Sequence, residues 1–241
     1  MQKETEAGLR NEVAACCRIA EYLDLFDFSG HVSARINGTD TFLINARDSV
    51  RSSIGLNDIV EVDFNGKSLE PGKNPPSEIY IHSEIYKRRT DVFSVAHLHS
   101  RAMIELSIAN KAYVPVNNRG SYFADGIPVY DHCHNIKTAE RGSNLAITLG
   151  RHRAVIIRGH GSVVVGENVK AVLFGAHFCE LNASYQIGAY RMGVEPRALT
   201  EDERAEYTRF WGQRIYEKVW NYYFEKANAG GDSSPNRLSV R

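Results

Sequence analysis

The chain has 241 residues with 29 basic and 29 acidic side chains, so its formal net charge is zero, and nine histidines add to that balance. A net charge of zero argues against charge-driven binding of nucleic acid or of an anionic membrane surface. The composition, 43% hydrophobic and 24% charged, is ordinary for a globular protein and excludes disorder as the dominant state.

The cysteine pattern and the N-terminus indicate a cytoplasmic protein. The four cysteines, Cys16, Cys17, Cys133 and Cys179, form no CxxC pair and no spacing typical of a disulfide framework. The N-terminal residues are polar and lack the apolar stretch of a signal peptide. No run approaches the roughly 18 apolar residues of a transmembrane helix. We therefore expect a reducing compartment and no membrane insertion.

Helical and strand patterns alternate along the chain. In chain order they predict a helix over 5–25; strands over 31–36, 41–45, 59–64 and 67–69; a helix over 78–89 capped by Ser77; a buried strand over 91–99; a helix over 101–109 capped by Ser100; irregular chain over 110–136; a helix over 138–149; strands over 154–157 and 163–165; and helices over 168–191 and 200–226. Strands that pair through hairpins between helices indicate one α/β domain over 1–227 with a mainly antiparallel central sheet. The Gly- and Ser-bearing segment 228–241 is predicted to be a flexible tail.

Three short patterns carry candidate chemistry. His97 and His99 lie two apart at the end of a buried strand, where both side chains face the same side and can chelate one metal ion. His160 lies between two glycines in a turn, and Glu78 lies at a helix start. Each pattern alone is weak, because hydrogen-bonded strand histidines, a turn histidine and a helix-capping carboxylate explain them equally well.

Their combination is more specific. The order of Pro76-Ser77-Glu78, then His97-Leu98-His99, then Gly159-His160-Gly161 resembles the class II aldolase/adducin family, over roughly residues 8–190. The resemblance implies an αβα sandwich around a nine-stranded, mostly antiparallel sheet. It implies a divalent metal ion held by His97, His99 and His160, with Glu78 as the catalytic acid/base. Three protein ligands leave an open position for substrate. Neutral imidazoles favour zinc, while manganese, cobalt and magnesium stay open.

Such a site favours cleavage of a carbon–carbon bond. A cation held by three histidines polarises a carbonyl or hydroxyl oxygen and stabilises the enolate formed when the adjacent bond breaks. The leaving fragment is then either an aldehyde or carbon dioxide. Glu78 or a water molecule would protonate the enolate.

The residues that would hold the anionic end of a small substrate favour a carboxylate over a phosphate. The sugar-phosphate aldolases of the family resemble one another in a cradle built from G-N-x-S, T-G and S-S-E motifs. This sequence instead carries His31 and Ser33 in G-H-V-S, Asn45 before an alanine, and a single Ser77 before the glutamate. We expect His31, with Arg47 or Arg51, to face a carboxylate.

The G-H-V-S-A-R and P-P-S-E forms resemble the branch of aromatic-acid decarboxylases that act on 3,4-dihydroxyphthalate or carboxy-hydroxymuconate semialdehyde. The leading hypothesis is a metal-dependent decarboxylase of a small hydroxylated aromatic or muconate-semialdehyde acid. The alternative is a class II aldolase or epimerase acting on a sugar phosphate or a small hydroxy-keto substrate. A third hypothesis is a non-catalytic binding module like the head of adducin.

Other polar residues stay open as site members. Arg119 and Tyr122, in the irregular middle, are candidate substrate contacts, and Arg158 is a weaker one. The remaining histidines are weighed as follows: His132 and His134, which flank Cys133, fit a plain loop or the rim of the site, and His82 fits a packed helix face or a contact with the site.

Finally, the last predicted helix carries more aromatic residues than one helix face normally buries. Its apolar side chains are Tyr207, Phe210, Trp211, Ile215, Tyr216, Val219, Trp220, Tyr222, Tyr223 and Phe224. Packing on the parent domain explains part of this surface. Because the family resemblance implies tetramers whose C-terminal residues reach a neighbouring subunit, we expect a homotetramer or another homo-oligomer.

Overall fold

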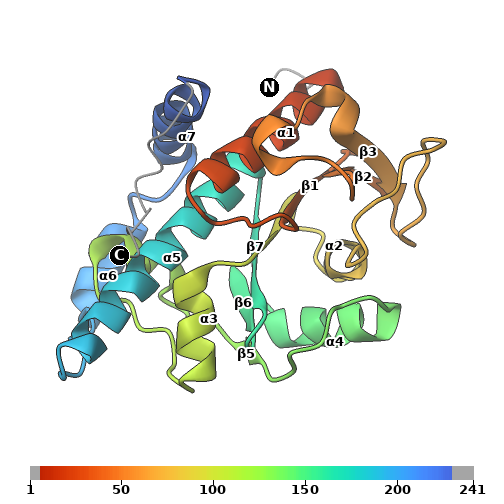
Figure 1. The fold of residues 1–241 in the computed structure, drawn as a ribbon. Coiled ribbons are helices and arrows are strands. Elements are labelled where there is room, and N and C mark those ends of the chain that lie inside the picture. Colours follow the sequence, from red (N-terminus) through yellow and green to blue (C-terminus); the bar gives the residue numbers. More distant parts are fainter. Residues whose placement is uncertain (1–5, 230–241) are drawn as a thin grey trace, which may run out of the picture.

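The computed structural model describes residues 6–229 as one layered α/β arrangement (Figure 1). The strands are β1 His31–Arg35, β2 Thr41–Asn45, β3 Ile59–Asp63, β4 Ser94–Leu98, β5 Val129–Tyr130, β6 Ala154–Ile157 and β7 Gly161–Gly166. The α-helices are α1 Glu6–Tyr22, α2 Tyr80–Arg88, α3 Arg101–Ile108, α4 Ala139–Leu149, α5 Val169–Arg191, α6 Glu201–Thr208 and α7 Gln213–Asn228. Three short 3-10 helices are η1 Arg51–Ser53, η2 Leu56–Asp58 and η3 Asn118–Phe123. Of the predicted tail, residues 230–241 lie outside this range.

The strands form one sheet in the order β3-β2-β1-β4-β7-β6-β5, antiparallel except for the β5–β6 pair. The predicted α/β class and mainly antiparallel sheet are confirmed. The number of strands implied by the family resemblance is wrong, because the described part of the chain contributes seven rather than nine. The predicted strand over 67–69 makes only the isolated bridge between Val62 and Ser68. Pro71 follows it and has no backbone N–H with which to extend the ladder.

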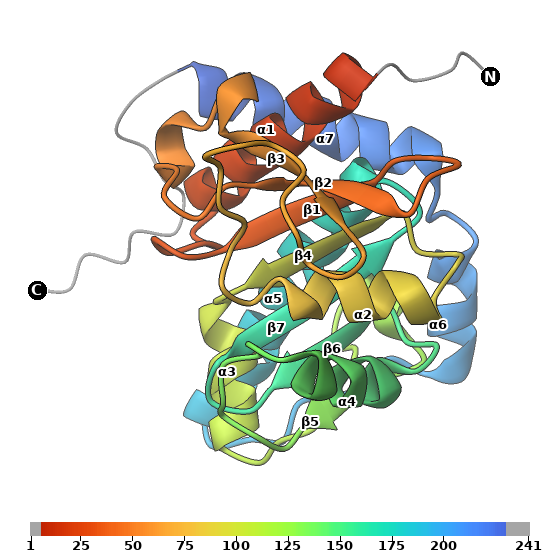
Figure 2. The same cartoon turned by 90° about the vertical axis from the view of Figure 1, so that its right-hand side faces the viewer.

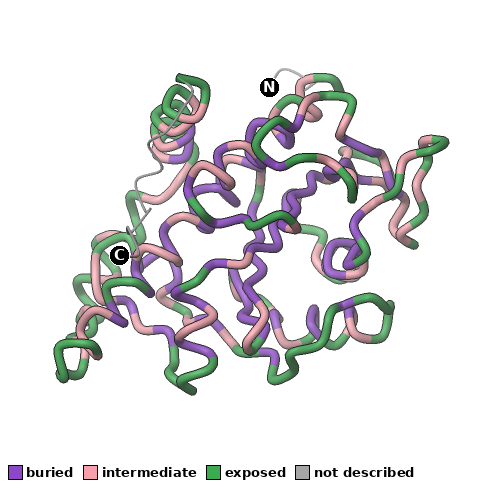
Figure 3. Tube along the Cα trace, viewed as in Figure 1, coloured by how far each residue is buried: buried purple, intermediate pink, exposed green. Residues whose placement is uncertain are grey.

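Side chains of each strand alternate between two hydrophobic cores, one on each face of the sheet. In β2, Leu43 packs into the core that contains α1, α3 and α5, whereas Phe42 and Ile44 pack into the core that contains α2 and α4. This is the period of two expected of a strand. The sheet is therefore the middle of three layers (Figure 2), and the buried segments run along it and along α5 (Figure 3).

The C-terminal helix differs from its prediction. One helix was expected over 200–226, but α6 ends at Thr208 and α7 begins after Gly212. The capping box of Thr200 and Glu203 is present as predicted. The break lets Trp211 turn inward, where its indole N–H donates to Ser121 Oγ at 3.0 Å. The partly buried indole N–H thereby gains a hydrogen-bond partner that a continuous helix would not give it.

Two predicted helix caps are also wrong. The helix α2 begins at Tyr80 rather than at Glu78, and Ser77 makes no capping hydrogen bond. The start of α3 is capped not by Ser100 but by Glu180 of α5, whose carboxylate accepts from the backbone N–H groups of Ala102 and Met103. A carboxylate from another helix satisfies these free N–H groups just as a local cap would.

The sheet register positions the candidate site. His31 of β1 is the cross-strand partner of His97 of β4, and β4 also pairs with β7. The turn between β6 and β7 carries His160, so it lies beside the end of β4. Within residues 6–229, no helix is long and apolar enough to cross a bilayer.

Candidate metal centre

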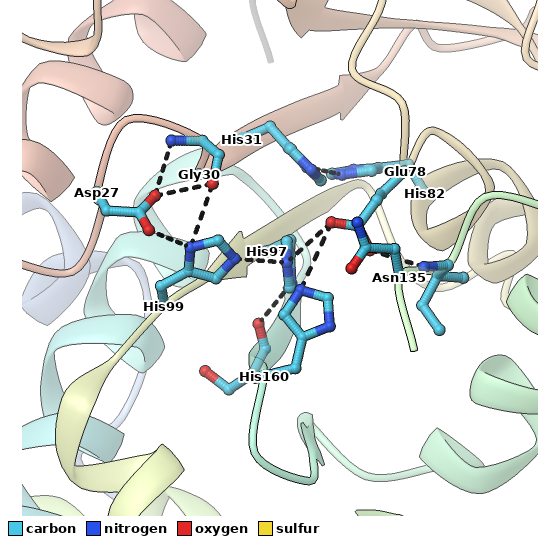
Figure 4. A network of polar contacts seen from close by, with 12 residues as sticks. Asp27, Gly30, His31, Glu78, His82, His97, His99, Asn135 and His160 are labelled. Carbon is cyan, nitrogen blue, oxygen red and sulfur yellow. Dashed lines mark hydrogen bonds and ion pairs between the residues drawn. The ribbon is translucent and has the colours of Figure 1, made fainter. Parts of the chain in front are cut away.

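Three histidines meet at the end of β4. His97 is the fourth residue of that strand, His99 follows its end, and His160 enters from the turn between β6 and β7 (Figure 4). The turn needs its glycines: Gly159 has φ +64°, and a Cβ on Gly161 would lie 2.3 Å from the carbonyl oxygen of Leu98. The two glycines therefore bring the imidazole of His160 against the end of β4.

Hydrogen bonds orient two of these imidazoles. His97 Nδ1 donates to the carbonyl oxygen of Ser162 at 3.2 Å, and His99 Nδ1 donates to Asp27 Oδ2 at 2.7 Å. Their Nε2 atoms then lie 3.2 Å apart. Burial is the main cause that lowers the pKa of His97 to about 3, so its ring is neutral at neutral pH. Because its Nδ1 donates to Ser162, His97 presents the lone pair of its Nε2 to His99.

A divalent cation fits between these nitrogens. Two ligand nitrogens of a tetrahedral zinc ion stand roughly 3.3 Å apart, close to the separation of these Nε2 atoms. Ligand atoms of His97, His99 and His160 all lie within 4.8 Å of one another. Outward Nδ1–H donation to a carbonyl and a carboxylate is the usual support of metal-binding imidazoles. Among the Nδ1 atoms of these three histidines, that of His160 is buried and has no hydrogen-bond partner within residues 6–229.

Glu78 faces the same point. Its Oε1 accepts from the backbone N–H of Ile136 at 2.7 Å, and its Oε2 lies 3.7 Å from His97 Nε2 and 3.6 Å from His160 Nε2. Burial raises the pKa of Glu78, but contact with the imidazoles of His160 and His97 and the N–H of Ile136 outweigh burial and lower the pKa to about 2. The carboxylate is therefore ionised at neutral pH.

A second group of possible ligands shares two of these residues. Ligand atoms of His31, Glu78 and His97 also lie within 4.8 Å of one another. His31 Nδ1 is already 2.7 Å from His82 Nε2. His31 therefore has one ring nitrogen left for the site.

The open side of the histidine cluster is a cavity of about 660 Å³. It is lined by Asp24, Phe26, Asp27, His99, Arg101, Ile104, Glu105, Cys133, Asn135, Gly159 and His160. Asp27 and Arg101 were missed by the sequence reasoning. Arg101 follows His99 by two residues, which could have drawn attention to it. Asp27 lies 72 residues before its partner His99, and no short motif announces it.

The predicted substrate residues near β1 are mostly held by the protein itself. Asn45 is fully buried, and its Oδ1 accepts from the backbone N–H of Val32 at 2.9 Å. Ser33 Oγ lies 2.6 Å from His82 Nδ1. Arg51 Nε donates to the carbonyl oxygen of Gly30 at 2.7 Å, so this guanidinium supports the loop before His31. These side chains position His31 instead of facing the cavity.

Arg47 and Ser77 are exposed, and neither side chain has a hydrogen-bond partner among residues 6–229. Ser77 directly precedes Glu78, so a substrate contact by either residue stays a prediction.

Within this chain, Arg119 and Tyr122 lie away from the histidine cluster, and a substrate contact by either residue stays a prediction. Arg119 packs over the ring of Phe178 on α5, with 5.2 Å between Cζ and the ring centre. The hydroxyl of Tyr122 lies 2.9 Å from Arg153, which precedes β6 at the opposite end from His160. The irregular segment crosses the α5 face of the sheet, and the sequence does not encode that path in any local motif.

The second H-x-H motif does not belong to either group of possible ligands. His132 and His134 are exposed and their ring centres are 6.1 Å apart. Cys133 lies between them and its thiol donates to the carbonyl oxygen of Gly159 at 3.4 Å, at the edge of the cavity. Arg158 pairs with Asp131. This loop therefore forms part of the cavity rim through Cys133.

Comparison with known proteins decides the family. The model of the class II aldolase and adducin N-terminal domain matches residues 11–187. The chain belongs to the class II aldolase and adducin family.

Two relatives of this class II aldolase family member are named 3,4-dihydroxyphthalate decarboxylase. The protein of Arthrobacter keyseri is 24% identical over 239 residues, which cover 93% of this chain and 96% of the relative. That of Terrabacter sp. (strain DBF63) is 30% identical over 183 residues, 70% of this chain and 76% of the relative. The solved L-fuculose 1-phosphate aldolase from Glaciozyma antarctica PI12 has a TM-score of 0.80 at 19% identity, over 92% of this chain and 89% of that one. The last likeness establishes the fold.

Replacing Asp27 tests whether its hydrogen bond orients His99 for metal binding. In D27N the carboxylate that accepts from His99 Nδ1 becomes an amide, so the orientation of this ring weakens. We expect zinc affinity to fall roughly 10- to 100-fold. Isothermal titration with zinc measures it, and D125N, at an exposed turn residue, is the matched control. Equal affinities in the two variants would contradict a supporting role for Asp27.

Acid should destabilise this family member when no metal is bound. Burial is the main cause that lowers the pKa of His82 and His97 to about 3, from an ordinary value of 6.5. The unfolded chain therefore binds protons that the folded one does not, and the free energy of unfolding falls as the pH drops from 6.5 towards 3. Each of these two histidines should lower the free energy of unfolding by about 2 kcal/mol between pH 7 and pH 5. Urea unfolding at both pH values measures this, and equal stability would refute it.

Proposed function

We propose that this protein is a metal-dependent carbon–carbon lyase, a decarboxylase of a small hydroxylated aromatic or muconate-semialdehyde acid. The observation that carries the proposal is the convergence of three imidazole Nε2 faces and the Glu78 carboxylate beside a cavity. His97, His99 and His160 would hold the cation, with zinc favoured and manganese, cobalt or magnesium as alternatives. The two relatives named for 3,4-dihydroxyphthalate support the substrate class.

The residues divide the work of such a reaction. A bound divalent cation would act as a Lewis acid on a substrate oxygen. Glu78, ionised and 3.6–3.7 Å from two of the candidate ligands, would take the proton of a substrate hydroxyl. When the bond to the carboxylate breaks, its electron pair stays on the ring or chain carbon as carbon dioxide leaves. Glu78 would return the proton to that carbon.

The chemistry around His31 supports a carboxylate substrate over a phosphate. A phosphate cradle needs several free N–H and hydroxyl donors. Here the amide of Asn45, the hydroxyl of Ser33 and the guanidinium of Arg51 are each engaged with other parts of the protein. Arg101 lines the cavity, and although its Nε donates to Glu105 Oε1 at 2.8 Å, its two terminal nitrogens suit a flat carboxylate. His31 keeps one ring nitrogen beside Glu78 and His97.

The alternative is an aldolase or epimerase that acts on a sugar phosphate or a small hydroxy-keto substrate. The likeness in fold to an L-fuculose 1-phosphate aldolase favours it. A purely binding module of the adducin type is disfavoured, since the complete histidine set and Glu78 are present together.

One assay separates these functions. Metal-loaded protein is incubated with 3,4-dihydroxyphthalate and related hydroxylated acids, and the carbon dioxide released is measured. The same protein is given L-fuculose 1-phosphate and ribulose 1-phosphate, with release of aldehyde as the readout. Carbon dioxide from one of the acids supports the decarboxylase. Aldehyde release without any carbon dioxide would establish the alternative, and a metal-free protein indifferent to chelators would favour the binding module.

We also propose that the chain forms a homo-oligomer in the cytoplasm. Tyr216 and Trp220 of the C-terminal helix are buried, but Phe210 and Tyr222 remain 60% and 54% exposed. Exposed large aromatic rings are typical of interfaces between subunits. Light scattering at micromolar concentration should give the mass of a tetramer or another oligomer of the 27.0 kDa chain. A monomer would refute this part of the proposal.

A further inference from the structure

A buried chain of hydrogen-bonding side chains runs from α2 to His31. His31 Nδ1 lies 2.7 Å from His82 Nε2, His82 Nδ1 lies 2.6 Å from Ser33 Oγ, and Ser33 Oγ lies 2.7 Å from the hydroxyl of Tyr86. All four residues are at most 2% exposed. Figure 4 shows the His31–His82 end of this chain beside Glu78 and His97. The reaction proposed above makes no use of His82 or Tyr86.

The direction of the hydrogen bonds follows from the Tyr86 end. Burial raises the pKa of Tyr86, so its hydroxyl keeps its proton. Contacts with Ser33, Arg35 and the backbone of Val95 oppose this rise in pKa, because each would stabilise a phenolate, but they do not outweigh burial. Within residues 6–229 the hydrogen-bond partner of the hydroxyl is Ser33 Oγ. A buried hydroxyl proton without an acceptor is costly, so Tyr86 donates to Ser33.

Each further proton is then determined in turn. Ser33 has one proton, and within residues 6–229 the remaining partner of its Oγ is His82 Nδ1, so Ser33 donates to that nitrogen. His82 Nδ1 accepts this proton, so the ring proton of His82 lies on Nε2, from which it donates to His31 Nδ1. His31 Nδ1 is then an acceptor, so the ring proton of His31 lies on Nε2. The opposite direction would leave the Tyr86 proton without an acceptor.

The position of His31 beside the metal centre agrees with this direction of the hydrogen bonds. The His31 ring lies 5.0 Å from the His97 ring, and one of its nitrogens lies within 4.8 Å of a Glu78 oxygen. Because Nδ1 is engaged with His82, Nε2 is the nitrogen free to face the site. An N–H directed at an ionised carboxylate is attractive, whereas a lone pair would be repelled.

We infer that Tyr86, Ser33 and His82 are positioning residues that hold His31 in the tautomer with a proton on Nε2. His31 is then a hydrogen-bond donor, and it cannot serve as a metal ligand through that nitrogen. This distinguishes the two groups of possible ligands and assigns the cation to His97, His99 and His160. The role of this donor rests on the proposed function: the Nε2–H of His31 would bind an anionic oxygen of the substrate carboxylate.

Nuclear magnetic resonance of the protein labelled with ¹⁵N-histidine tests the tautomer directly. The wild type should show a protonated Nε2 and an unprotonated Nδ1 for His31, and its assignment comes from the loss of this signal in H31Q. A protonated Nδ1 in the wild type would overturn the inference. The measurement needs neither metal nor substrate, so it stands apart from the outcome of the decarboxylase assay.

Two variants test the positioning role. Y86F and S33A remove the donors that direct the chain, so both should give a mixture of His31 tautomers and a KM roughly tenfold higher with kcat less affected. Y80F removes a hydroxyl from the same helix outside the chain and should match the wild type in both readouts. An unchanged tautomer in folded Y86F and S33A would refute the role of these two residues.

Zinc binding supplies an independent check. If His31 is a donor, H31Q binds zinc with wild-type stoichiometry and an affinity within about threefold of the wild type, since no ligand is lost. A loss of affinity as large as the roughly 100-fold expected for removal of a true ligand would place His31 among the ligands and overturn the inference.

Discussion

Replacing His160 with alanine should lower zinc affinity by more than about 100-fold and reduce the lyase activity in proportion. Substitutions that only disturb the support of a metal ligand cost roughly 10- to 100-fold, and this one removes a ligand itself. The fold should survive, because His160 Nδ1 has no hydrogen-bond partner within residues 6–229 and the residue lies in a glycine-flanked turn. Isothermal titration with zinc and thermal unfolding of the metal-free variant give the two quantities.

The control for this variant is H152A. His152 precedes β6 at the opposite end from the histidine cluster, and its Nδ1 lies 3.1 Å from the carbonyl oxygen of Gly126. The control should keep zinc affinity and activity. If H160A retained wild-type zinc affinity, the assignment of His160 as a ligand would be wrong.

Replacing Glu78 with glutamine should lower kcat by roughly 10²- to 10⁴-fold while zinc still binds. The amide keeps an oxygen that can accept from the backbone N–H of Ile136, so the local structure is retained. It loses the charge that accepts a proton beside His97 and His160. Steady-state kinetics with the substrate identified in the carbon dioxide assay, together with zinc titration, separate the catalytic effect from the metal effect.

E84Q is the matched control on the same segment. Glu84 pairs with Lys87 at 2.7 Å on α2 and has no contact with the histidine cluster. Its kcat should stay within about twofold of the wild type, since an exposed ion pair contributes little. A kcat in E78Q equal to that in E84Q would remove Glu78 from the proton transfer.

The sequence singled out the three histidines that the structure brings together because they lie in short motifs. A strand with His97 and His99 two residues apart gives the same-side geometry locally, and a glycine-flanked His160 indicates a turn. The helix α5 was also predicted with its cap at Asn168, since capping is a local effect. The structure adds that the two motifs meet.

What the sequence could not show depends on long-range packing. Asp27 reaches His99 only because the loop after α1 returns to the end of β4. The ring of Tyr122, a candidate substrate contact from the sequence, packs beside Phe174 in the core on the α5 face. The role of Glu180 at the start of α3 likewise depends on how two helices pack. None of these contacts leaves a periodic or short-range signal.

Anomalous diffraction at the zinc absorption edge, from crystals of the zinc-loaded protein, tests the central claim most directly. A single peak bonded to Nε2 of His97, His99 and His160, with Glu78 beside it and outside the bonding distance of roughly 2.0–2.2 Å, is the predicted result. A peak held by His31, Glu78 and His97, or no peak at the end of β4, would contradict the proposed metal centre.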